Sequence, residues 1–517
     1  MNKEKVSLKT LGPYLALSLV GSVLVAFAAS LGFPLGLIAL VGLAGAIIGG
    51  ILIVVYPQTM VLFLVVYMPL ESFLIKFTPG PEQVYLVAQL GSEALVYILF
   101  AVVLAKRILA GKPIRHTPID LLLILFVIGA VLSIFLNGAS PWASLSNLRP
   151  MLRFVLLYYV VVNLDFSERQ VNRLLWAILI GGAIQILLGV VQRLGGVPVK
   201  AVFVPRASTL DVLGKSRNFV LLQSGRELGS VFGTLGDTLH FGIFISIVLI
   251  VYLSRLKQLT WASLLVISAL MGGIALSYAR GVFFSALIIL IVWYAVFYRP
   301  VYIPILVGTG LALAILVGAM VLFGSTAANE QYFNPRQTET TAARNLLSIF
   351  SQSYLERARN QRLGAVIFVP PVILREKPVF GYGPDTPLAL EKLSETELPA
   401  VYRVLRESIF EDVYWVALLT YYGLFGFLMF LGIFLAVSAT AWKKHLDRAA
   451  SPTSRALGRM AFLMVVNAVL ILFFYRALEF RVFGFYLWFL AGIAISDSFT
   501  RRQELLKLEN RQEPASG

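Results

Sequence analysis

The segment Arg375-Glu376-Lys377-Pro378-Val379-Phe380-Gly381-Tyr382-Gly383-Pro384 lies inside a polar interruption, residues 323–412, between two long apolar runs. Its closely spaced prolines and glycines predict a rigid turn. The interruption ends at Glu411-Asp412, which places acidic side chains at the start of the next apolar run. Because nearly all of the remaining chain is apolar, we take this interruption as the feature around which the rest is organised.

The composition is that of a polytopic membrane protein. Of the 517 residues, 58% are hydrophobic and 14% are charged, and the mean hydropathy is +0.83. Soluble domains have a smaller apolar share and a charged share of about a quarter. The predicted fold class is therefore an all-α polytopic membrane protein with one large, partly helical external loop.

Residue usage excludes several kinds of chemistry. The absence of cysteine excludes disulfides and thiolate catalysis. The three histidines, His116, His240 and His445, are widely spaced and form no metal-ligand motif, so we expect no metal and no cofactor. The net charge of +16 has two candidate sources, cytoplasmic loops and a site for an anion. Nucleic acid is not an expected partner, because no soluble segment carries a basic stripe with interleaved aromatic residues.

Hydropathy predicts about 14 transmembrane helices, each near the 20 residues or so that cross a hydrocarbon core of about 30 Å. Since two of the segments are short, the expected range is 12–14. Lys3, Lys5 and Lys9 precede the first apolar run, which we interpret as a retained helix because no cleavage site follows it. The predicted spans are 11–31, 35–55, 59–76, 85–108, 118–136, 148–163, 172–193, 236–254, 260–277, 281–298, 302–323, 413–440, 457–475 and 480–496.

Basic residues in the short loops orient these helices, because cytoplasmic loops are enriched in Lys and Arg. With the N-terminus inside, every strongly basic short loop and the C-terminal tail fall on the cytoplasmic side. The basic loop residues are Lys106, Arg107, Lys112, Arg115, Arg169, Arg173, Arg255, Lys257, Arg299, Lys443, Lys444 and Arg448.

The spans and their orientation divide the chain into five parts. These are N-terminal transmembrane helices (1–137), central transmembrane helices (138–323) with an external loop at 194–235, a large external loop (324–411), C-terminal transmembrane helices (412–498) and a cytoplasmic tail (499–517).

The same orientation places arginines in external turns, against the usual bias. Arg280 stands between two apolar spans in the turn Ser277-Tyr278-Ala279-Arg280-Gly281. Arg149 and Arg153, four residues apart, share one face near the external start of another helix. Such side chains either snorkel to the membrane surface as anchors or bind an anion, since guanidinium matches phosphate oxygens.

Two further external segments carry arginine. Arg226 lies in the loop at 194–235, on the side nearest the membrane, and is either solvated or in contact with an anion. Arg476 and Arg481 lie in the turn before the last predicted span.

The large loop should contain helices of its own, because a structureless stretch of this length is unusual. Residues 340–363 have the composition of a helix on the membrane surface. We expect Phe368-Val369-Pro370-Pro371 to break that helix. A solvent-facing helix should begin near Leu388 and carry Glu391, Glu395 and Glu397.

Asp412, at the end of the loop, has two interpretations. A carboxylate beside low-dielectric lipid and near arginines is suited to acid–base chemistry, since burial raises its pKa while arginine lowers it. Aspartate is also a preferred N-cap residue for the helix that follows, and one residue can do both. Glu407 and Glu411 are alternative bases.

Taken in order, several motifs resemble the O-antigen ligase and O-antigen polymerase superfamily, over roughly residues 140–495. They are Arg362 before an apolar stretch, Lys377-Pro378-Val379-Phe380-Gly381-Tyr382-Gly383, and Asp412 with Gly423-Leu424-Phe425-Gly426 after it. The turn Ser277-Tyr278-Ala279-Arg280-Gly281 is similar to the superfamily's Ser-x-Arg-Gly element with one residue inserted, and Phe232-Gly233-Thr234 stands where a Phe/Gly segment is expected.

The resemblance implies a metal-independent glycosyltransferase of the GT-C type in the bacterial inner membrane, with its site facing the periplasm. Its partners would be a polyprenyl-pyrophosphate-linked oligosaccharide, the lipid bilayer and a chain-length regulator. Arg226 and Arg280 would stabilise the departing pyrophosphate. Asp412 would accept the proton of the attacking sugar hydroxyl, with inversion at the anomeric carbon. Substrate contacts would come from Arg149, Arg153, Arg362, Tyr414, Arg476 and Arg481.

One departure separates the two branches of the superfamily. Ligases usually carry a His-Asn pair eleven residues before the glycine that is Gly423 here, and this chain has Asp412 and Val413 at that place. This favours a polymerase of O-antigen, capsule or exopolysaccharide units over a ligase that acts on lipid A–core or protein. The alternative from another class is a lipid-linked glycan flippase or transporter, but no internal repeat is apparent and the external loop is larger than transport needs.

Overall fold

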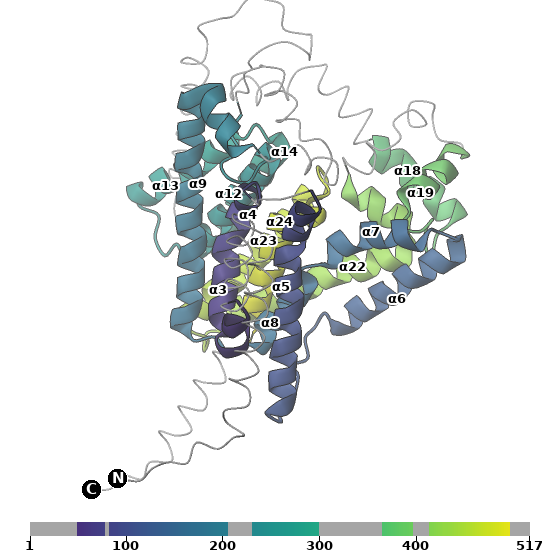
Figure 1. The fold of residues 1–517 in the computed structure, drawn as a ribbon, viewed down its shortest axis with the longest axis horizontal. Coiled ribbons are helices and arrows are strands. Elements are labelled where there is room, and N and C mark those ends of the chain that lie inside the picture. The colour runs from purple at the N-terminus through teal and green to yellow at the C-terminus, as the bar shows by residue number, and fades with distance from the viewer. Residues whose placement is uncertain (1–48, 78–81, 205–229, 299–363, 397–412, 497–517) are drawn as a thin grey trace, which may run out of the picture.

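The structure, a computed structural model, describes residues 49–77, 82–204, 230–298, 364–396 and 413–496 (Figure 1). Across these ranges the chain folds into helices and contains no strand. In chain order the elements are α3 (Pro57–Tyr67), η1 (Met68–Leu70), α4 (Glu71–Ile75), α5 (Glu82–Leu109), α6 (Asp120–Asn137), α7 (Pro141–Leu152), α8 (Val155–Asn163), α9 (Glu168–Phe203), α12 (Thr238–Arg255), α13 (Trp261–Leu276), α14 (Arg280–Trp293), η2 (Tyr294–Tyr298), α18 (Gly364–Glu376), α19 (Thr386–Ser394), α22 (Tyr414–Leu446), α23 (Pro452–Ile471), η5 (Ala477–Glu479) and α24 (Arg481–Ile495).

Nine helices within the described ranges are long and apolar enough to cross a membrane, which confirms the predicted class of all-α, multi-pass membrane protein. Two more apolar helices, α13 and α24, are shorter. The predicted spans at 11–31 and 302–323, and most of that at 35–55, lie outside the described residues. The total of about fourteen spans and the GT-C arrangement therefore remain predictions.

Two of the predicted spans are composite. The span at 59–76 consists of α3, η1 and α4, and Pro69, which lacks a backbone donor, lies in the η1 turn that joins the two helices. The span at 148–163 starts earlier than predicted, at Pro141, and consists of α7 and α8. The earlier start has a local cause, because Pro141 favours the first helical turn and Ser140 caps it.

A central pair of helices, α12 and α24, forms the core. All residues of α24 from Val482 to Ala494 are buried, and so are those of α12 from Phe241 to Val251. α24 contacts α8, α23 and α12, while α12 also contacts α9 and α13. A helix that is buried on every face belongs in a protein interior, so residues 482–494 of α24 lie among other helices rather than in lipid.

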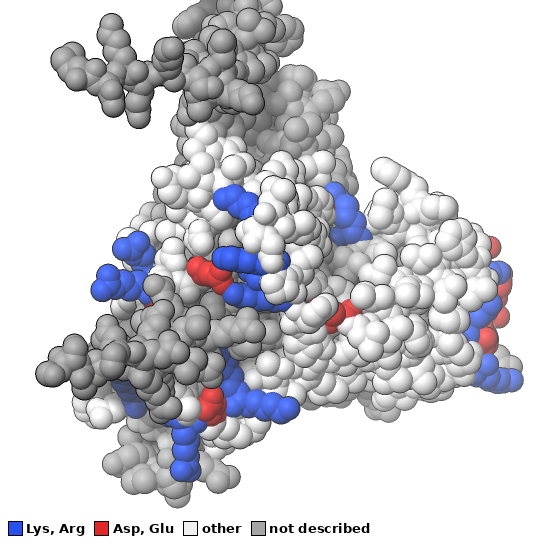
Figure 2. All heavy atoms as spheres, turned by 90° about the horizontal axis from the view of Figure 1, so that it is seen from below, with Lys and Arg blue, Asp and Glu red and all other residues white. Residues whose placement is uncertain are grey.

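The basic loops assigned to the cytoplasmic side meet at one end of this bundle. The guanidinium of Arg255, at the end of α12, lies 5.3 Å from the ring centroid of Trp176, near the start of α9. Lys444, at the end of α22, donates a hydrogen bond to the carbonyl of Ala494 at the end of α24 (2.7 Å). Figure 2 views the molecule from below and shows Lys and Arg side chains at several places on this side. The predicted topology assigns this end to the cytoplasmic side.

The external loop predicted at 194–235 begins with helical structure. α9 continues to Phe203, beyond the expected end of its span at residue 193. Gly196 interrupts the helix with φ 61° and ψ −151°, a conformation that glycine adopts readily, and the chain then resumes a helical path. Lys200 in this last part is fully buried, so the start of the loop packs into the protein.

The expectation that Pro370 and Pro371 break a helix is wrong, because α18 runs through both prolines from Gly364 to Glu376. The reason is tertiary packing. Ala365, Val369 and Ile373 recur every four residues and are buried, and α18 packs against α22. Burial of this stripe compensates for the backbone hydrogen bonds that the prolines cannot make. Glu391 on α19 and Glu395 just after it are exposed as expected, and Glu397 lies outside the described residues.

The turn predicted from Pro378 to Pro384 is confirmed, and it contacts a break in α22. Gly381 and Gly383 have φ of 60° and 91°, and Gly423, inside α22, has φ 62° and ψ −167°. The backbones meet directly at these glycines: a Cβ added to Gly381 would lie 2.4 Å from the carbonyl oxygen of Thr420, and one added to Gly423 would lie 2.3 Å from that of Val379. Only glycine fits at either position.

Hydrogen bonds from the turn replace those that α22 loses at its break. Four of them join the two backbones, from N–H to C=O: Tyr382 to Thr420 (2.8 Å), Gly383 to Tyr421 (3.0 Å), Leu424 to Pro378 (2.8 Å) and Phe425 to Val379 (3.1 Å). α6 adds two side chains, since the Ser133 hydroxyl bonds to the carbonyl of Tyr421 (2.8 Å) and the Asn137 amide donates to that of Gly381 (2.9 Å). The loop is therefore tied into the membrane helices by backbone groups.

This contact predicts that Gly423→Ala and Gly381→Ala each destabilise the protein by about 2 kcal/mol or more, because a left-handed φ strains alanine and the added Cβ collides with backbone. The midpoint temperature of unfolding in detergent measures the effect. Gly91→Ala is the matched control, since Gly91 is helical and has nothing within 4 Å of an added Cβ. A midpoint unchanged in all three variants would contradict the prediction.

Candidate functional site

The turn that carries Arg280 has an unusual backbone. Tyr278 has φ 60°, and among the described residues it is the one non-glycine residue with positive φ. Such strain in a non-glycine residue is often found at functional sites. α14 starts at Arg280, and a Cβ on Gly281 would lie 2.6 Å from the Phe474 ring. Arg280 therefore begins a helix whose first turn packs against the segment that leads to Arg476.

The segment Phe232-Gly233-Thr234 lies beside this turn. The N–H of Val231 donates to the carbonyl of Leu276, at the end of α13 (3.1 Å). Two buried glutamines of α9 hold the segment: Gln192 accepts from the N–H of Gly233 (2.9 Å), and Gln185 accepts from that of Thr234 (3.0 Å). Gly233 lies so close to Gln185 that a Cβ would collide with its amide oxygen, which explains why glycine stands here.

Arg476 and Tyr414 meet at the same end of the bundle. The N–H of Tyr414, the first residue of α22, donates to the carbonyl of Leu472 (2.9 Å), so the start of α22 is fixed to the turn after α23. Within that turn, Arg476 donates to the Glu479 carboxylate through Nε (2.8 Å) and Nη2 (2.5 Å). Tyr414 itself is buried and lies within electrostatic reach of both side chains.

α7 brings two more arginines to this end. Arg149 pairs with Glu93 of α5 at 3.4 Å, and Glu93 also accepts a hydrogen bond from the Tyr97 hydroxyl (2.6 Å). Arg153, only 4% exposed, donates to the backbone carbonyl of Glu479. Arg149 and Arg153, which were predicted to share one helix face, therefore both contact other parts of the protein.

The last arginine of the group is paired with a buried acid. Arg481, at the start of α24, lies 3.1 Å from the carboxylate of Glu71 at the start of α4, and the Glu71 side chain is only 4% exposed. Arg153 lies within electrostatic reach of both Arg481 and Glu71, as well as of Arg149 and Glu93. We call the whole set the arginine–carboxylate cluster, and it consists of Arg149, Arg153, Arg476, Arg481, Glu71, Glu93 and Glu479.

The large loop reaches this cluster through α7. The Asn147 amide donates to the Pro384 carbonyl (3.0 Å) and to the Thr386 hydroxyl (3.2 Å), and its oxygen accepts from Arg476 (3.5 Å). Asp385 accepts from the backbone N–H of Ser140 (3.0 Å). The turn that is hydrogen-bonded to α22 therefore also places the following loop residues, Pro384 and Thr386, next to Asn147 and Arg476.

The cluster retains unused hydrogen-bonding capacity. Within the described residues, no partner exists for Oε2 of Glu93 or for Nε of Arg153 and Arg481. The same holds for Gln89 and Ser92, which precede Glu93 on α5, at Nε2 and Oγ respectively. A buried polar group without a partner costs about 1–3 kcal/mol, so the site favours a polar ligand or ordered water.

The cluster has the charge balance that binding an anion would require. Its four arginines exceed its three carboxylates by one positive charge. Burial lowers the pKa of Arg476, but the Glu479 carboxylate and the nearby Tyr421 and Tyr414 side chains raise it by more, so this pKa lies above its ordinary value and Arg476 stays charged. In the described part of the chain, no group of three or more His, Cys, Asp or Glu side chains is placed to hold a metal ion.

The structure thus brings together Arg149, Arg153, Arg476, Arg481 and Tyr414, with the turn of Arg280 packed beside them. Arg226, Arg362 and Asp412 lie outside the described residues. Sequence analysis missed Glu71 and Glu93. A signal was present, because each is a carboxylate inside a predicted apolar span, where ionisable residues are usually functional.

Comparisons with known proteins add no family to this picture. No family model matches the chain, and no curated protein matches it either. The resemblance to the O-antigen ligase and polymerase superfamily therefore stays a prediction.

The buried pair of Arg481 and Glu71 predicts a specific pattern of stability. Arg481→Met should destabilise the protein by about 3–5 kcal/mol, because Glu71 is left charged and unpaired in the interior. Adding Glu71→Gln should recover much of this loss, since the uncompensated charge disappears. Unfolding midpoints of the two single variants and the double variant in detergent measure the coupling.

The matched control for this cycle is an exposed ion pair. Lys392 and Glu395 lie 3.2 Å apart, with side chains 45% and 58% exposed. Lys392→Met should change stability by less than about 1 kcal/mol. An equal loss of stability in Arg481→Met and Lys392→Met would show that the pair of Arg481 and Glu71 behaves like an exposed ion pair.

Proposed function

We propose that this protein is a membrane glycosyltransferase of the O-antigen polymerase type, which joins oligosaccharide units carried on polyprenyl pyrophosphate. The observation that supports the proposal most is the gathering of four arginines, from α7, the turn before η5 and the start of α24, at the end where α14 begins with Arg280. The proposed site faces the periplasm, and the opposite, basic end faces the cytoplasm.

The chemistry of the substrate suits this arrangement. A pyrophosphate leaving group develops negative charge as its bond to the anomeric carbon breaks, and guanidinium groups fixed in a low-dielectric site stabilise that charge without reorganising. In the proposed reaction, Arg280 and Arg226 contact the pyrophosphate. The four arginines of the cluster bind the remaining phosphate oxygens or the glycan. Glu71, Glu93 and Glu479 hold those arginines in position.

The bond changes of the proposed step are simple. A hydroxyl of the acceptor sugar attacks the anomeric carbon from the side opposite the pyrophosphate, so that one C–O bond forms and another breaks with inversion. The hydroxyl proton passes to Asp412, and the leaving pyrophosphate departs with the electron pair of the broken bond. General base catalysis of this kind contributes about 10²–10⁴-fold.

A break inside a membrane helix is also a feature of secondary transporters, where freed backbone groups bind substrate or ions. The break of α22 at Gly423 differs in its partners. Backbone groups on both sides of it bond to the 378–383 turn rather than lining a cavity. The transporter alternative therefore receives less support than the enzyme.

The test is an assay with purified full-length protein, a synthetic polyprenyl-pyrophosphate oligosaccharide and no added metal. Wild type should give a ladder of multiples in gel mobility. Arg280→Ala and Asp412→Ala should each reduce the rate by about 10²-fold or more, because each removes a group that acts on the transition state. Arg173→Ala, an exposed arginine of α9 at the opposite end, should keep the wild-type rate.

Other outcomes would replace the proposal. Transfer only after lipid A–core is added would make the protein a ligase. The absence of turnover with either acceptor would favour a flippase, to be tested by transport of the same lipid across vesicles. Full activity of both site variants would remove Arg280 and Asp412 from the mechanism.

A further inference from the structure

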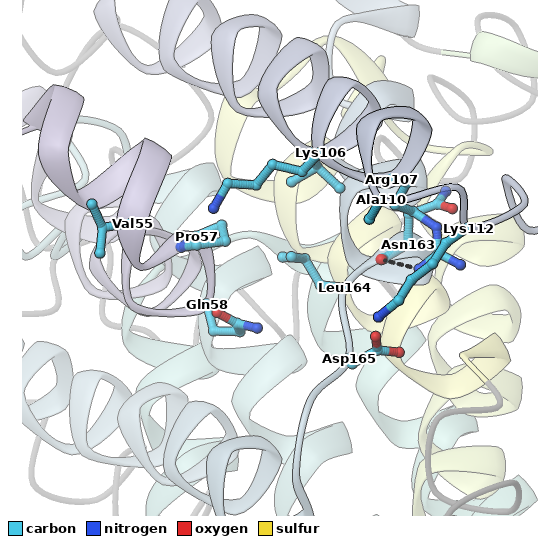
Figure 3. Close-up of a pocket in the computed structure, with 11 residues that line it drawn as sticks. Val55, Pro57, Gln58, Lys106, Arg107, Ala110, Lys112, Asn163, Leu164 and Asp165 are labelled. Atoms are coloured by element: carbon cyan, nitrogen blue, oxygen red, sulfur yellow. Dashed lines mark hydrogen bonds between the residues drawn. The ribbon is translucent and has the colours of Figure 1, made fainter. Parts of the chain in front are cut away.

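A second polar site lies at the opposite end of the bundle from the arginine–carboxylate cluster. It is a pocket of about 420 Å³ between the start of α3, the end of α5 and the end of α8 (Figure 3). Its polar lining includes Gln58, Lys106, Arg107, Lys112, Asn163 and Asp165.

Three helices connect the two sites and place them far apart. α3 begins in the pocket at Pro57, and α4 starts at the cluster with Glu71, about 14 residues or roughly 20 Å away along the helices. α5 likewise carries Glu93 to the cluster and Lys106 to the pocket. Neither the sequence motifs nor the proposed reaction uses this pocket.

The floor of the pocket is held by Arg107. Its guanidinium donates to the carbonyl of Pro113 through Nε (3.1 Å) and Nη2 (2.8 Å), and to that of Asn163 through Nη1 (2.9 Å). These bonds close the turn after α5 onto the end of α8. The positions from which Lys106 and Lys112 extend are therefore fixed by backbone contacts.

The two lysines are the groups available to a ligand. Both are exposed, and within the described residues neither has an ion-pair partner. The carboxylate of Asp165, which also lines the pocket, pairs with Arg115 instead. In Figure 3 the Lys106 side chain extends toward Pro57 at the start of α3, and the Lys112 side chain extends toward Asp165 on the other side of Asn163. The pocket thus presents positive charge with its one acid already neutralised.

Apolar surface flanks this charge. Val54 and Val55, on the segment before α3, are 51% and 53% exposed. In the predicted topology this end lies at the cytoplasmic membrane surface, where these valines would meet acyl chains and the lysines would meet the head groups. A phosphate on an apolar tail matches both parts of this surface, whereas a soluble anion matches only the charge.

We propose that the pocket binds the phosphate group of an anionic phospholipid, held by Lys106 and Lys112. The uncapped start of α3 at Pro57 adds a helix N-terminus to the same pocket, and its dipole favours negative charge. The ligand is a lipid of the leaflet that this end faces, and it joins α3, α5 and α8. The inference is independent of the proposed glycosyltransferase function.

The test uses purified full-length protein in neutral detergent, titrated with phosphatidylglycerol or with phosphatidylcholine, with bound lipid counted by native mass spectrometry. Wild type should bind at least one phosphatidylglycerol in preference to phosphatidylcholine. The double variant Lys106→Gln/Lys112→Gln should bind it about 30-fold more weakly, since each lysine near a lipid surface contributes about 1 kcal/mol. Arg169→Gln/Arg173→Gln, which removes two exposed cations of the same face outside the pocket, should bind like wild type.

Three results would overturn the proposal. Equally weakened phosphatidylglycerol binding in both double variants would mean diffuse electrostatic attraction rather than a specific site. Unchanged binding in the lysine variant would show that the pocket does not bind the lipid. A parallel titration with inorganic phosphate separates the two sources of the ligand. If phosphate displaces the lipid at comparable concentration, the pocket holds a soluble anion and the lipid assignment fails.

Discussion

The contact between the 378–383 turn and the break of α22 is the constraint on which the described structure depends most. Inside a membrane, each backbone N–H and C=O needs a partner from the protein, because lipid offers none. α22 breaks at Gly423, and the turn supplies partners on both sides of the break. This exchange of backbone hydrogen bonds holds a polar loop at one place in the bundle. It also places Pro384 and Thr386 beside Asn147, and through it beside Arg476.

Charge is the second constraint, and it works with the first. Four arginines cannot be gathered in a largely apolar protein without acids to offset their repulsion and the cost of burial. Glu71, Glu93 and Glu479 provide that compensation from three separate segments. Because the carboxylates number one fewer than the arginines, the cluster keeps a net positive charge, and several of its buried polar atoms have no partner within the described residues.

Local chemistry was sufficient for some features and insufficient for others. The turn at Pro378–Pro384 follows from residues that restrict their own backbone, so it was predictable. The continuation of α18 through Pro370 and Pro371 was not, because burial of Ala365, Val369 and Ile373 against α22 outweighs the local preference. The helical start of the 194–235 loop was missed for a similar reason, since Lys200 is buried by contacts that no hydropathy window contains.

The sequence by itself determined the class of protein and the positions of most helices in the described ranges. It also identified the arginines of the predicted external turns as candidate anion-binding residues. These depend on composition and on properties of neighbouring residues, which are local. Only the tertiary structure decided that Arg481 meets Glu71, about 410 positions away, and that the Gly381 turn fits the break at Gly423. Such pairings depend on how whole helices pack. A side chain's partner is the group nearest to it in space, and that group can come from a segment hundreds of residues away, which local sequence patterns do not specify.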